Sequence, residues 1–252
     1  MKYLAYCQDV KTPNAHTIAS LDEATALGST ATFPLFVKPT KAGDSLGIDH
    51  SSLVHDATEL INKASATLPD YPELLVEEYI EGREFTVLVA ANPDGKTCKS
   101  FKPVEYIFPE GFAFKTYALK TSELHPGANI PCNDPVLEAQ LRAAAEKIFK
   151  GFSGKGYARM DFRVRGNDIY FLEVNFSCSV FYADGYEGSA DYILKYDGIG
   201  QGGFLQHIIA EGMASHQRKQ NAFEMKGNSI AGYGIYAKYD LPINTLLFKG
   251  EE

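Results

Sequence analysis

The sequence has few cysteines, few histidines and no long apolar run, and each shortage excludes a class of protein. The cysteines, Cys7, Cys98, Cys132 and Cys178, show no CxxC or paired spacing, so a reducing, cytoplasmic setting is expected. The six histidines form no HxH or HExxH pattern, and zinc chemistry is therefore not expected. No apolar run approaches the roughly 18 residues of a membrane span, and Met1-Lys2-Tyr3 does not open a signal peptide, so no membrane partner is expected.

Positive charge is also scarce. The chain carries 24 Lys and Arg against 32 Asp and Glu, a formal net charge of -8. Because nucleic-acid phosphates are bound by clustered Lys and Arg, this balance argues against a nucleic-acid partner, although it leaves room for a basic pocket that holds one nucleotide. With 252 residues, 45% of them hydrophobic, the chain can bury a full core in one domain of two lobes or in two small domains.

Helix and strand signals alternate without regular βαβ spacing, which predicts an α+β fold. Capping boxes at Ser20 and Asp56 predict helix starts, and Asn133-Asp134-Pro135 begins an amphipathic helix that Gly151 ends. Strands are predicted over 33–39, 74–80 and 84–90, and a later helix near 203–214. The main domain is predicted to span residues 1–214, followed by a polar linker over 215–227 and a β-rich tail over 228–252.

The stretch 157–177 is predicted to form two strands joined by a turn at Arg165-Gly166-Asn167-Asp168, with Gly166 at positive φ. Alternation places Arg159, Asp161 and Arg163 on one face of the first strand. It places Phe171, Glu173 and Asn175 on one face of the second. If the turn is centred on Asn167, then Asp161 lies opposite Glu173 and Arg159 lies opposite Asn175.

Two carboxylates that face each other across a strand pair repel, and a bound cation would make the same arrangement favourable. Asp161, Glu173 and Asn175 offer only hard oxygen ligands, which suit Mg²⁺ better than zinc or copper. The alternative is that these side chains line a solvated face of the sheet.

Two upstream segments have the chemistry of a nucleotide site. Lys38 ends a short strand and precedes a loop with Gly43 and Gly47, where backbone N–H groups could approach a polyphosphate; an ordinary turn is the alternative, since no Walker Gly-Lys-Ser/Thr follows. The run Glu77-Glu78-Tyr79-Ile80, with Glu84 beyond it, forms a strand exit whose backbone can pair with an adenine edge. An exposed acidic strand end is the alternative there.

Two motifs resemble those of the ATP-grasp ligases, in particular the D-alanine–D-alanine ligase branch: Arg159-Met160-Asp161 and Phe171-Leu172-Glu173-Val174-Asn175. Together with the upstream segments in this order, they extend the resemblance over most of residues 1–212. The resemblance implies two α+β lobes with the nucleotide between them, lobe one covering about 20–82. It implies ATP, two Mg²⁺ ions for which Mn²⁺ could substitute, and small-molecule carboxylate and amine substrates. It leaves a homodimer open.

The resemblance also implies roles for individual residues. Lys2, Lys38 and Ser45 would hold ATP phosphates, Glu77, Tyr79 and Ile80 the adenine, and Glu84 the ribose. Lys120, or Lys115 in its place, would reach the transferred phosphate, and Arg159 would lie over the acyl-phosphate and tetrahedral intermediates. Asp161, Glu173 and Asn175 would bind the metal ions.

Departures from the family pattern bear on the substrate. Gly43-Asp44-Ser45 stands where those ligases have Gly-Ser-Ser. Phe176–Asp184 stands where they have a Pro-Gly segment leading to a serine that holds the substrate carboxylate, and Asp184 would repel the carboxylate of D-alanine. A substrate other than D-alanine is therefore expected, and no general base is identified. The family's N-terminal substrate domain would lie outside this sequence.

Two other functions stay open beside the ligase. One is a non-catalytic nucleotide-binding module of a larger protein, fused to a SET methyltransferase. The other is a different ATP-grasp reaction such as carboxylation or peptide ligation. The C-terminal residues Asn228–Ala237 and Asp240–Glu251 resemble the opening strands of a SET methyltransferase domain, with Gly232 and Gly234 as its Gly-x-Gly turn. An amphipathic β-hairpin is the alternative for this tail.

Overall fold

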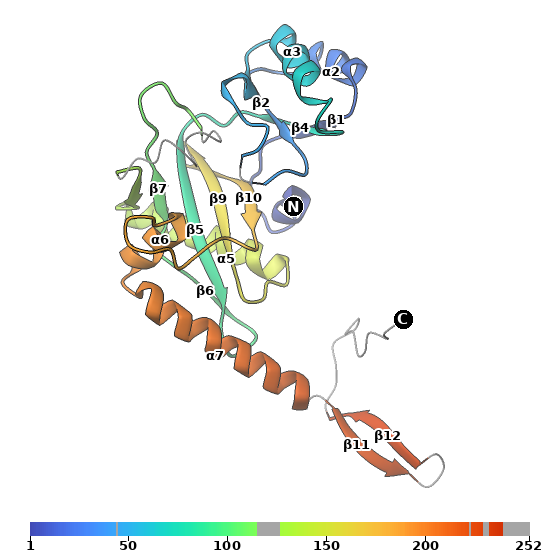
Figure 1. Ribbon diagram of the computed structural model, residues 1–252, viewed down its shortest axis with the longest axis vertical. Helices are drawn as coiled ribbons and strands as arrows, with labels where there is room; N and C mark the ends of the chain where they lie inside the picture. Colours follow the sequence, from blue (N-terminus) through green and yellow to red (C-terminus); the bar gives the residue numbers. More distant parts are fainter. Residues whose placement is uncertain (44, 115–126, 222, 229–231, 239–252) are drawn as a thin grey trace.

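The computed structural model describes residues 1–43, 45–114, 127–221, 223–228 and 232–238. Two larger antiparallel sheets, each with its own helices, form two lobes (Figure 1). The four-stranded sheet and its helices are called lobe one, and the six-stranded sheet and its helices lobe two. The predicted α+β class is confirmed.

Lobe one has a four-stranded sheet with two helices packed against it. The strand order is β1 (Ala15–Ile18), β4 (Leu74–Glu78), β2 (Leu35–Pro39) and β3 (Leu53–Val54), with η1 (His50–Ser52) leading into β3. Helices α2 (Leu21–Gly28) and α3 (Ala57–Thr67) begin at the predicted caps, because Ser20 and Asp56 accept hydrogen bonds from the backbone N–H groups three residues on. Since β1 pairs with β4, lobe one starts before the predicted boundary near residue 20.

Lobe two has a six-stranded sheet that is covered on both faces. The strand order is β10 (Asp168–Asn175), β9 (Tyr157–Arg165), β5 (Arg83–Ala91), β7 (Val104–Tyr106) and β8 (Asn129–Pro131), and β6 (Cys98–Ser100) pairs with the end of β5. Helix α5 (Pro135–Gly151) packs on one face, and α6 (Ser189–Asp197) and α7 (Gly200–Asn221) pack on the other. Because apolar side chains find a core on either face, every residue of β5 after Arg83 is buried.

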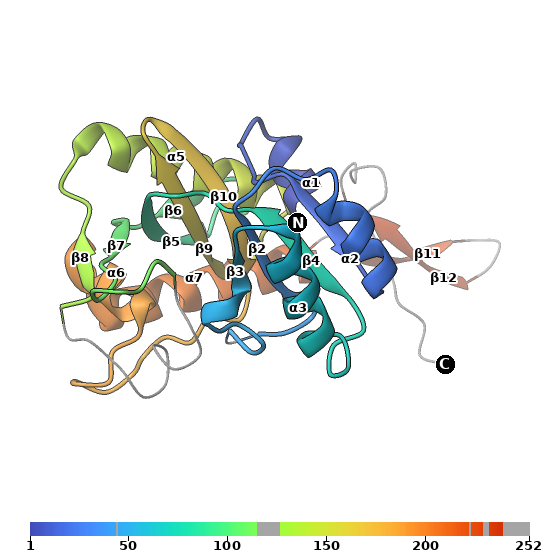
Figure 2. The ribbon, with the colours of Figure 1, turned by 90° about the horizontal axis from the view of Figure 1, so that it is seen from above.

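The first helix belongs to lobe two although the chain next enters lobe one. Helix α1 (Lys2–Tyr6) packs against α5 and β10, and the chain then makes a parallel bridge between Lys11 and Tyr170 before β1. In Figure 2, α1 and the strands of lobe one lie beside the β9–β10 end of the larger sheet. The junction between the lobes is therefore built from the N-terminal segment, lobe one and this hairpin.

The C-terminal part differs from the sequence prediction. Helix α7 continues to Asn221 through residues predicted as a polar linker, because Ser215–Gln220 contain no glycine or proline and polarity alone does not end a helix. Strands β11 (Phe223–Asn228) and β12 (Gly232–Ala237) form a hairpin beyond it, so the β structure starts before residue 228 (Figure 1). Both interpretations of the tail predicted such strands, residues 239–252 lie outside the described part, and the SET resemblance stays a prediction. No described helix is long and apolar enough to span a membrane.

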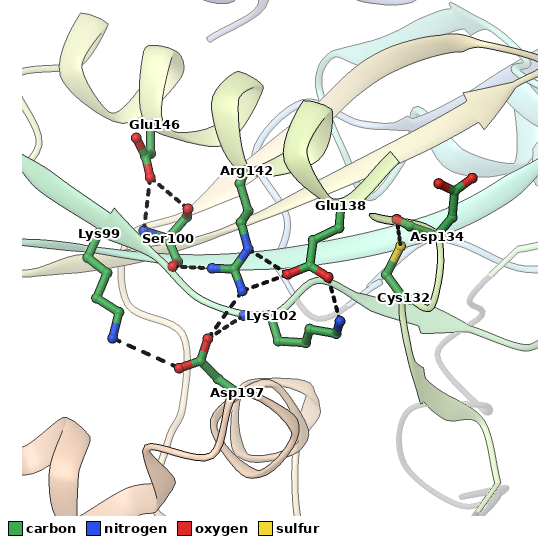
Figure 3. Close-up of polar contacts among 9 residues, drawn as sticks. All are labelled: Lys99, Ser100, Lys102, Cys132, Asp134, Glu138, Arg142, Glu146 and Asp197. Atoms are coloured by element: carbon green, nitrogen blue, oxygen red, sulfur yellow. Dashed lines mark hydrogen bonds and ion pairs between the residues drawn. The ribbon is translucent and has the colours of Figure 1, made fainter. Parts of the chain in front are cut away.

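A polar network around Arg142 joins α5 to the end of α6 (Figure 3). The Arg142 guanidinium lies 2.9 Å from Glu138 and 3.3 Å from Asp197, and it also donates to the Ser100 carbonyl. Asp197 accepts a hydrogen bond from the Lys102 backbone N–H at 3.0 Å. Because its members come from α5, β6 and α6, the network holds elements from both faces of the sheet together.

We expect Arg142→Met to lower the free energy of unfolding by about 1–3 kcal/mol, because it removes a cation from two largely buried carboxylates. Lys99→Met is the matched control, since Lys99 is half-exposed and lies 3.9 Å from Asp197, and it should cost less than about 0.5 kcal/mol. Urea denaturation measures both. Equal losses for the two variants would contradict this assignment.

Candidate functional site

The β9–β10 hairpin places the predicted metal ligands as expected. Asp161 pairs with Glu173 and Arg159 pairs with Asn175. The turn is tighter than predicted, with Arg165 opposite Asp168 and Gly166 at φ 60°, and the extra residue is taken up by a bulge between Phe171 and Glu173. The predicted pairing is confirmed, but the register that produces it is different.

The bulge also corrects the prediction that Phe171 shares a face with Glu173. Phe171 is fully buried on the opposite face, where its ring lies 5.9 Å from that of Phe162. Leu172 and Glu173 instead both line the cavity between the lobes, which strict alternation would not allow for consecutive residues. Because of this extra residue, β10 places both the apolar side chain of Leu172 and the carboxylate of Glu173 in the cavity wall.

Next to this hairpin, a buried carboxylate lies between two predicted phosphate-binding lysines. Glu77 Oε1 is 2.6 Å from Lys2 Nζ, and Glu77 Oε2 is 3.1 Å from Lys38 Nζ. Lys38 also lies 3.8 Å from Glu173, and Lys2 donates to the Leu172 carbonyl at 3.3 Å. Lys2 comes from α1 of lobe two, whereas Lys38 and Glu77 come from lobe one, so this cluster ties the lobes together.

The charges in the cluster shift its pKa values. Burial opposes ionisation of Glu77, but Lys38 and Lys2 together lower its pKa below the usual range. Burial likewise disfavours the charged form of Lys38, yet Glu77 and Glu173 raise its pKa. For Lys2, burial lowers the pKa, and the neighbouring Lys38 adds to this effect. The two lysines thus favour the ionised form of Glu77, and the carboxylates favour the charged form of Lys38.

Arg159 and Asp161 form a second ion pair at the end of the hairpin. Arg159 Nε lies 3.5 Å from Asp161 Oδ1, and this carboxylate raises the pKa of the guanidinium. Nearby Cys178 is buried, and burial raises the pKa of its thiol to about 11, so the thiol is a poor nucleophile.

An open cavity of about 100 Å³ lies between the lobes. Many of the predicted site residues line it: Lys38, Ser45, Glu77, Tyr79, Ile80, Glu84, Asp161 and Glu173. Lys2, Arg159 and Asn175 are not in its lining, although each contacts or pairs with a residue of the cluster described above. Lys115 and Lys120 lie outside the described residues.

The cavity also has lining residues that the sequence analysis missed. They are Phe36, Ile48, Glu78, Phe114, Leu172 and Arg163. The apolar members look like ordinary core residues in a sequence, whereas Arg163 could have been found from its position two residues after Asp161 on the same strand face. Two aromatic rings also reach lobe one: Phe114 lies 4.9 Å from Phe36, and Phe112 lies 5.1 Å from His50.

A lysine of α3 fixes the loop after Lys38 by polar contacts. Lys63 Nζ, which is buried, donates to the Gly47 carbonyl at 3.1 Å and lies 2.9 Å from Asp49 Oδ1. Gly47 has a φ of 77°, and a Cβ there would lie 2.6 Å from the Pro39 ring, so glycine is required. Gly43 faces no such restriction. The loop that carries Ser45 is therefore fixed against the end of β2.

The donor set fits a hard divalent cation. The described residues contain no group of three or more His, Cys, Asp and Glu side chains that could hold a metal, but Asp161 lies opposite Glu173, and Asn175 follows two residues later on β10. Around this point the basic side chains Lys2, Lys38 and Arg159 face the acidic side chains Glu77, Asp161 and Glu173. A polyphosphate entering a balanced site would need added positive charge, which a divalent cation supplies.

We expect Glu77→Gln to destabilise the protein by about 3 kcal/mol at pH 7, because two lysines lose a buried partner. Since folding lowers the pKa of Glu77, its contribution is complete above the ordinary carboxyl pKa of about 4 and is lost as the pH falls below it, through the lowered pKa of the folded state. The difference between wild type and variant, measured by denaturant unfolding from pH 7 down to about pH 2, should therefore shrink mainly below about pH 4. A constant difference would contradict the assigned ion pairs.

Comparison with known proteins gives relatives of one kind. The chain is 36% identical over 150 residues to a D-alanine--D-alanine ligase of Legionella pneumophila (strain Corby), covering 57% of this chain and 40% of that protein. It is 29% identical over 202 residues to a D-alanine--D-alanine ligase of Bradyrhizobium sp. (strain ORS 278), covering 78% of this chain and 52% of the relative. The chain thus spans about half the length of these curated relatives.

Solved structures with the same fold are also D-alanine ligases. The VanG D-Ala:D-Ser ligase of Enterococcus faecalis superposes with a TM-score of 0.63 at 22% identity, covering 83% of this chain and 59% of that one. The D-alanine--D-alanine ligase of Bacillus anthracis complexed with ATP gives 0.61 at 23% identity, covering 87% and 65%. These likenesses show the ATP-grasp fold.

The family comparison covers most of the two lobes. The profile described as "D-ala D-ala ligase C-terminus" matches residues 9–179, which include lobe one and the hairpin with Arg159, Asp161, Glu173 and Asn175. The match ends just after β10, so α6, α7 and the terminal strands lie beyond it. This chain belongs to the D-alanine–D-alanine ligase C-terminal family, whose fold is the ATP-grasp.

Proposed function

We propose that this chain carries the ATP site of a Mg²⁺-dependent carboxylate–amine ligase that works through an acyl phosphate. The observation that carries the proposal is the cavity between the lobes, which gathers the residues matching the family's nucleotide and metal ligands from β2, β4, β5, β9 and β10. Because the chain spans about half the length of its curated relatives, the reaction belongs to the whole protein.

In this proposal the residues divide between the two ends of the nucleotide. Glu77, Tyr79 and Ile80 take the adenine and Glu84 the ribose. Lys2, Lys38 and Ser45 hold the phosphates, with Lys120 (or Lys115) reaching the phosphate that is transferred. Asp161, Glu173 and Asn175 are the ligands of the two metal ions, which neutralise phosphate charge when they are bound.

The chemistry explains why a site of this composition is needed. A carboxylate is a poor electrophile, so one of its oxygens attacks the γ-phosphorus of ATP, and ADP leaves. The amine then attacks the acyl carbon of the resulting acyl phosphate, inorganic phosphate leaves, and the amine loses a proton. Arg159, fixed by Asp161, is placed to stabilise the negative charge that develops on the acyl oxygen.

The loop after β10 supports a substrate other than D-alanine. Asp184 and Tyr186 are exposed in it, and the buried Asp191 anchors it by accepting hydrogen bonds from the backbone N–H groups of Phe181 and Gly188, at 2.9 and 3.1 Å. A carboxylate at Asp184 would repel a substrate carboxylate that bound beside this loop. The substitution at Asp44 lies outside the described residues.

Calorimetric titration with a non-hydrolysable ATP analogue tests the nucleotide and metal site. Wild type should bind at least roughly tenfold more tightly with Mg²⁺ than without it, and Asp161→Asn should lose most of that gain. Asp168→Asn is the matched control on the same hairpin, because Asp168 pairs with the exposed Lys11 instead, and it should bind like wild type. Metal-independent binding, or no binding by wild type, would refute the proposed site.

A coupled assay of ADP release tests the substrate class. D-alanine alone should leave ADP release at background, because Asp184 disfavours a second carboxylate, whereas amines without a carboxylate are expected to include the acceptor. D-alanine-dependent turnover by wild type would contradict this expectation. Bicarbonate-dependent release would indicate carboxylation, and tight nucleotide binding without turnover on any acceptor would indicate a non-catalytic module.

A further inference from the structure

Arg163 is a buried cation in the cavity wall that has no part in the roles proposed above. It lies on β9, two residues after Asp161 and on the same face of the strand. Its side chain is only 5% exposed, yet it lines the cavity. A buried guanidinium must have partners for its N–H groups, so what it binds indicates what it does.

Its main partner is the proposed ribose ligand. Glu84 lies directly opposite Arg163 in the pairing of β5 with β9. Arg163 Nε donates to Glu84 Oε2 at 3.1 Å, and Arg163 Nη2 lies 3.0 Å from the same oxygen. Glu84 is itself buried, and this contact with the guanidinium offsets part of the cost of burying its carboxylate.

The remaining N–H groups reach two segments that border the cavity. Nη1 donates to the Gly82 carbonyl at 3.2 Å and lies 3.4 Å from the Tyr79 hydroxyl. Nη2 donates to the Ala113 carbonyl at 2.6 Å, next to Phe114 in the cavity wall. The guanidinium therefore links β5, the strand exit after β4 and the segment before Phe114.

The guanidinium also lies against two aromatic rings. Its central carbon is 5.5 Å from the centroid of Tyr79 and 5.2 Å from that of Phe108. Ring contacts and several acceptors together leave the planar group little freedom to rotate. Its orientation, and with it that of the Glu84 carboxylate, is therefore fixed before any ligand arrives.

We propose that Arg163 is a positioning residue that makes the nucleotide site selective for the ribose hydroxyls, by holding the Glu84 carboxylate in one orientation in the cavity wall. This inference rests on the proposed function, in which Glu84 binds the ribose. A site built to bond a hydroxyl discriminates strongly against an analogue that lacks it, because its own polar group is then left without a partner. Discrimination of this kind requires a carboxylate whose side chain cannot rotate away from the ribose hydroxyls.

The experiment compares binding of Mg·ADP with that of Mg·2′-deoxy-ADP and Mg·3′-deoxy-ADP by calorimetry. Wild type should prefer ADP over at least one deoxy analogue by roughly tenfold or more, as expected for a hydrogen bond to a charged group. Arg163→Met should reduce this preference to about threefold or less. Arg163→Lys, which keeps the charge but not the planar fork, should lie between the two and serves if the Met variant does not fold.

Two further variants separate positioning from general stabilisation. Arg83→Met is the matched control. Arg83 lies on the same strand as Glu84 but pairs with Glu105 of β7, outside the cavity lining. This variant should keep the wild-type preference for ADP. Glu84→Gln should lose the preference, and combining it with Arg163→Met should change the preference no further, since Arg163 acts through Glu84.

The outcomes separate the inference from the proposed function. Full wild-type preference in the folded Arg163 variants would overturn the inference, and so would equal affinity of wild type for all three nucleotides, while nucleotide binding itself would stand. Failure of wild type to bind any of the nucleotides with Mg²⁺ would instead overturn the proposed function.

Discussion

The pairing of Asp161 with Glu173 across the β9–β10 hairpin is the constraint on which the rest of the site depends. Two carboxylates opposite each other are unfavourable in a bare strand pair, and each is therefore accompanied by a cation, Arg159 for Asp161 and Lys38 for Glu173. Lys38 comes from lobe one, so the packing of the two lobes brings a cation of one lobe next to a carboxylate of the other. The positions of these charges therefore depend both on the register of β9 with β10 and on the packing of lobe one against lobe two.

Glu77 also joins the two lobes, because it forms ion pairs with Lys2 of lobe two and with Lys38 of lobe one. Around it, Lys63 fixes the loop after β2, and Phe114 and Phe112 reach from lobe two to rings of lobe one. The polar side of the cavity is therefore held in place before a ligand arrives. A preorganised site of this kind loses little free energy to ordering when it binds a polyphosphate.

Local patterns in the sequence were enough to predict the α+β class, the helix starts at Ser20, Asp56 and Asp134, and the facing of Asp161 and Glu173. The bulge at Leu172 was missed because nothing in the side-chain alternation marks one extra residue, and this placed Phe171 on the wrong face. The continuation of α7 was missed because polar composition was taken as a break. Arg163 was missed because its partners, Glu84, Gly82 and Ala113, are distant in sequence and meet only in the folded chain.

The central claim is that Glu173 belongs to a ligand site and contributes little to the fold itself. Its side chain is 45% exposed, and the cation that faces it, Lys38, lies 3.8 Å away. The decisive measurement is the difference in unfolding free energy between wild type and Glu173→Gln, without ligand and with saturating Mg·ADP. We expect a difference below about 1 kcal/mol without ligand and a gain for wild type of about 2–3 kcal/mol with ligand near a hundred times its Kd. The same difference under both conditions would contradict the account.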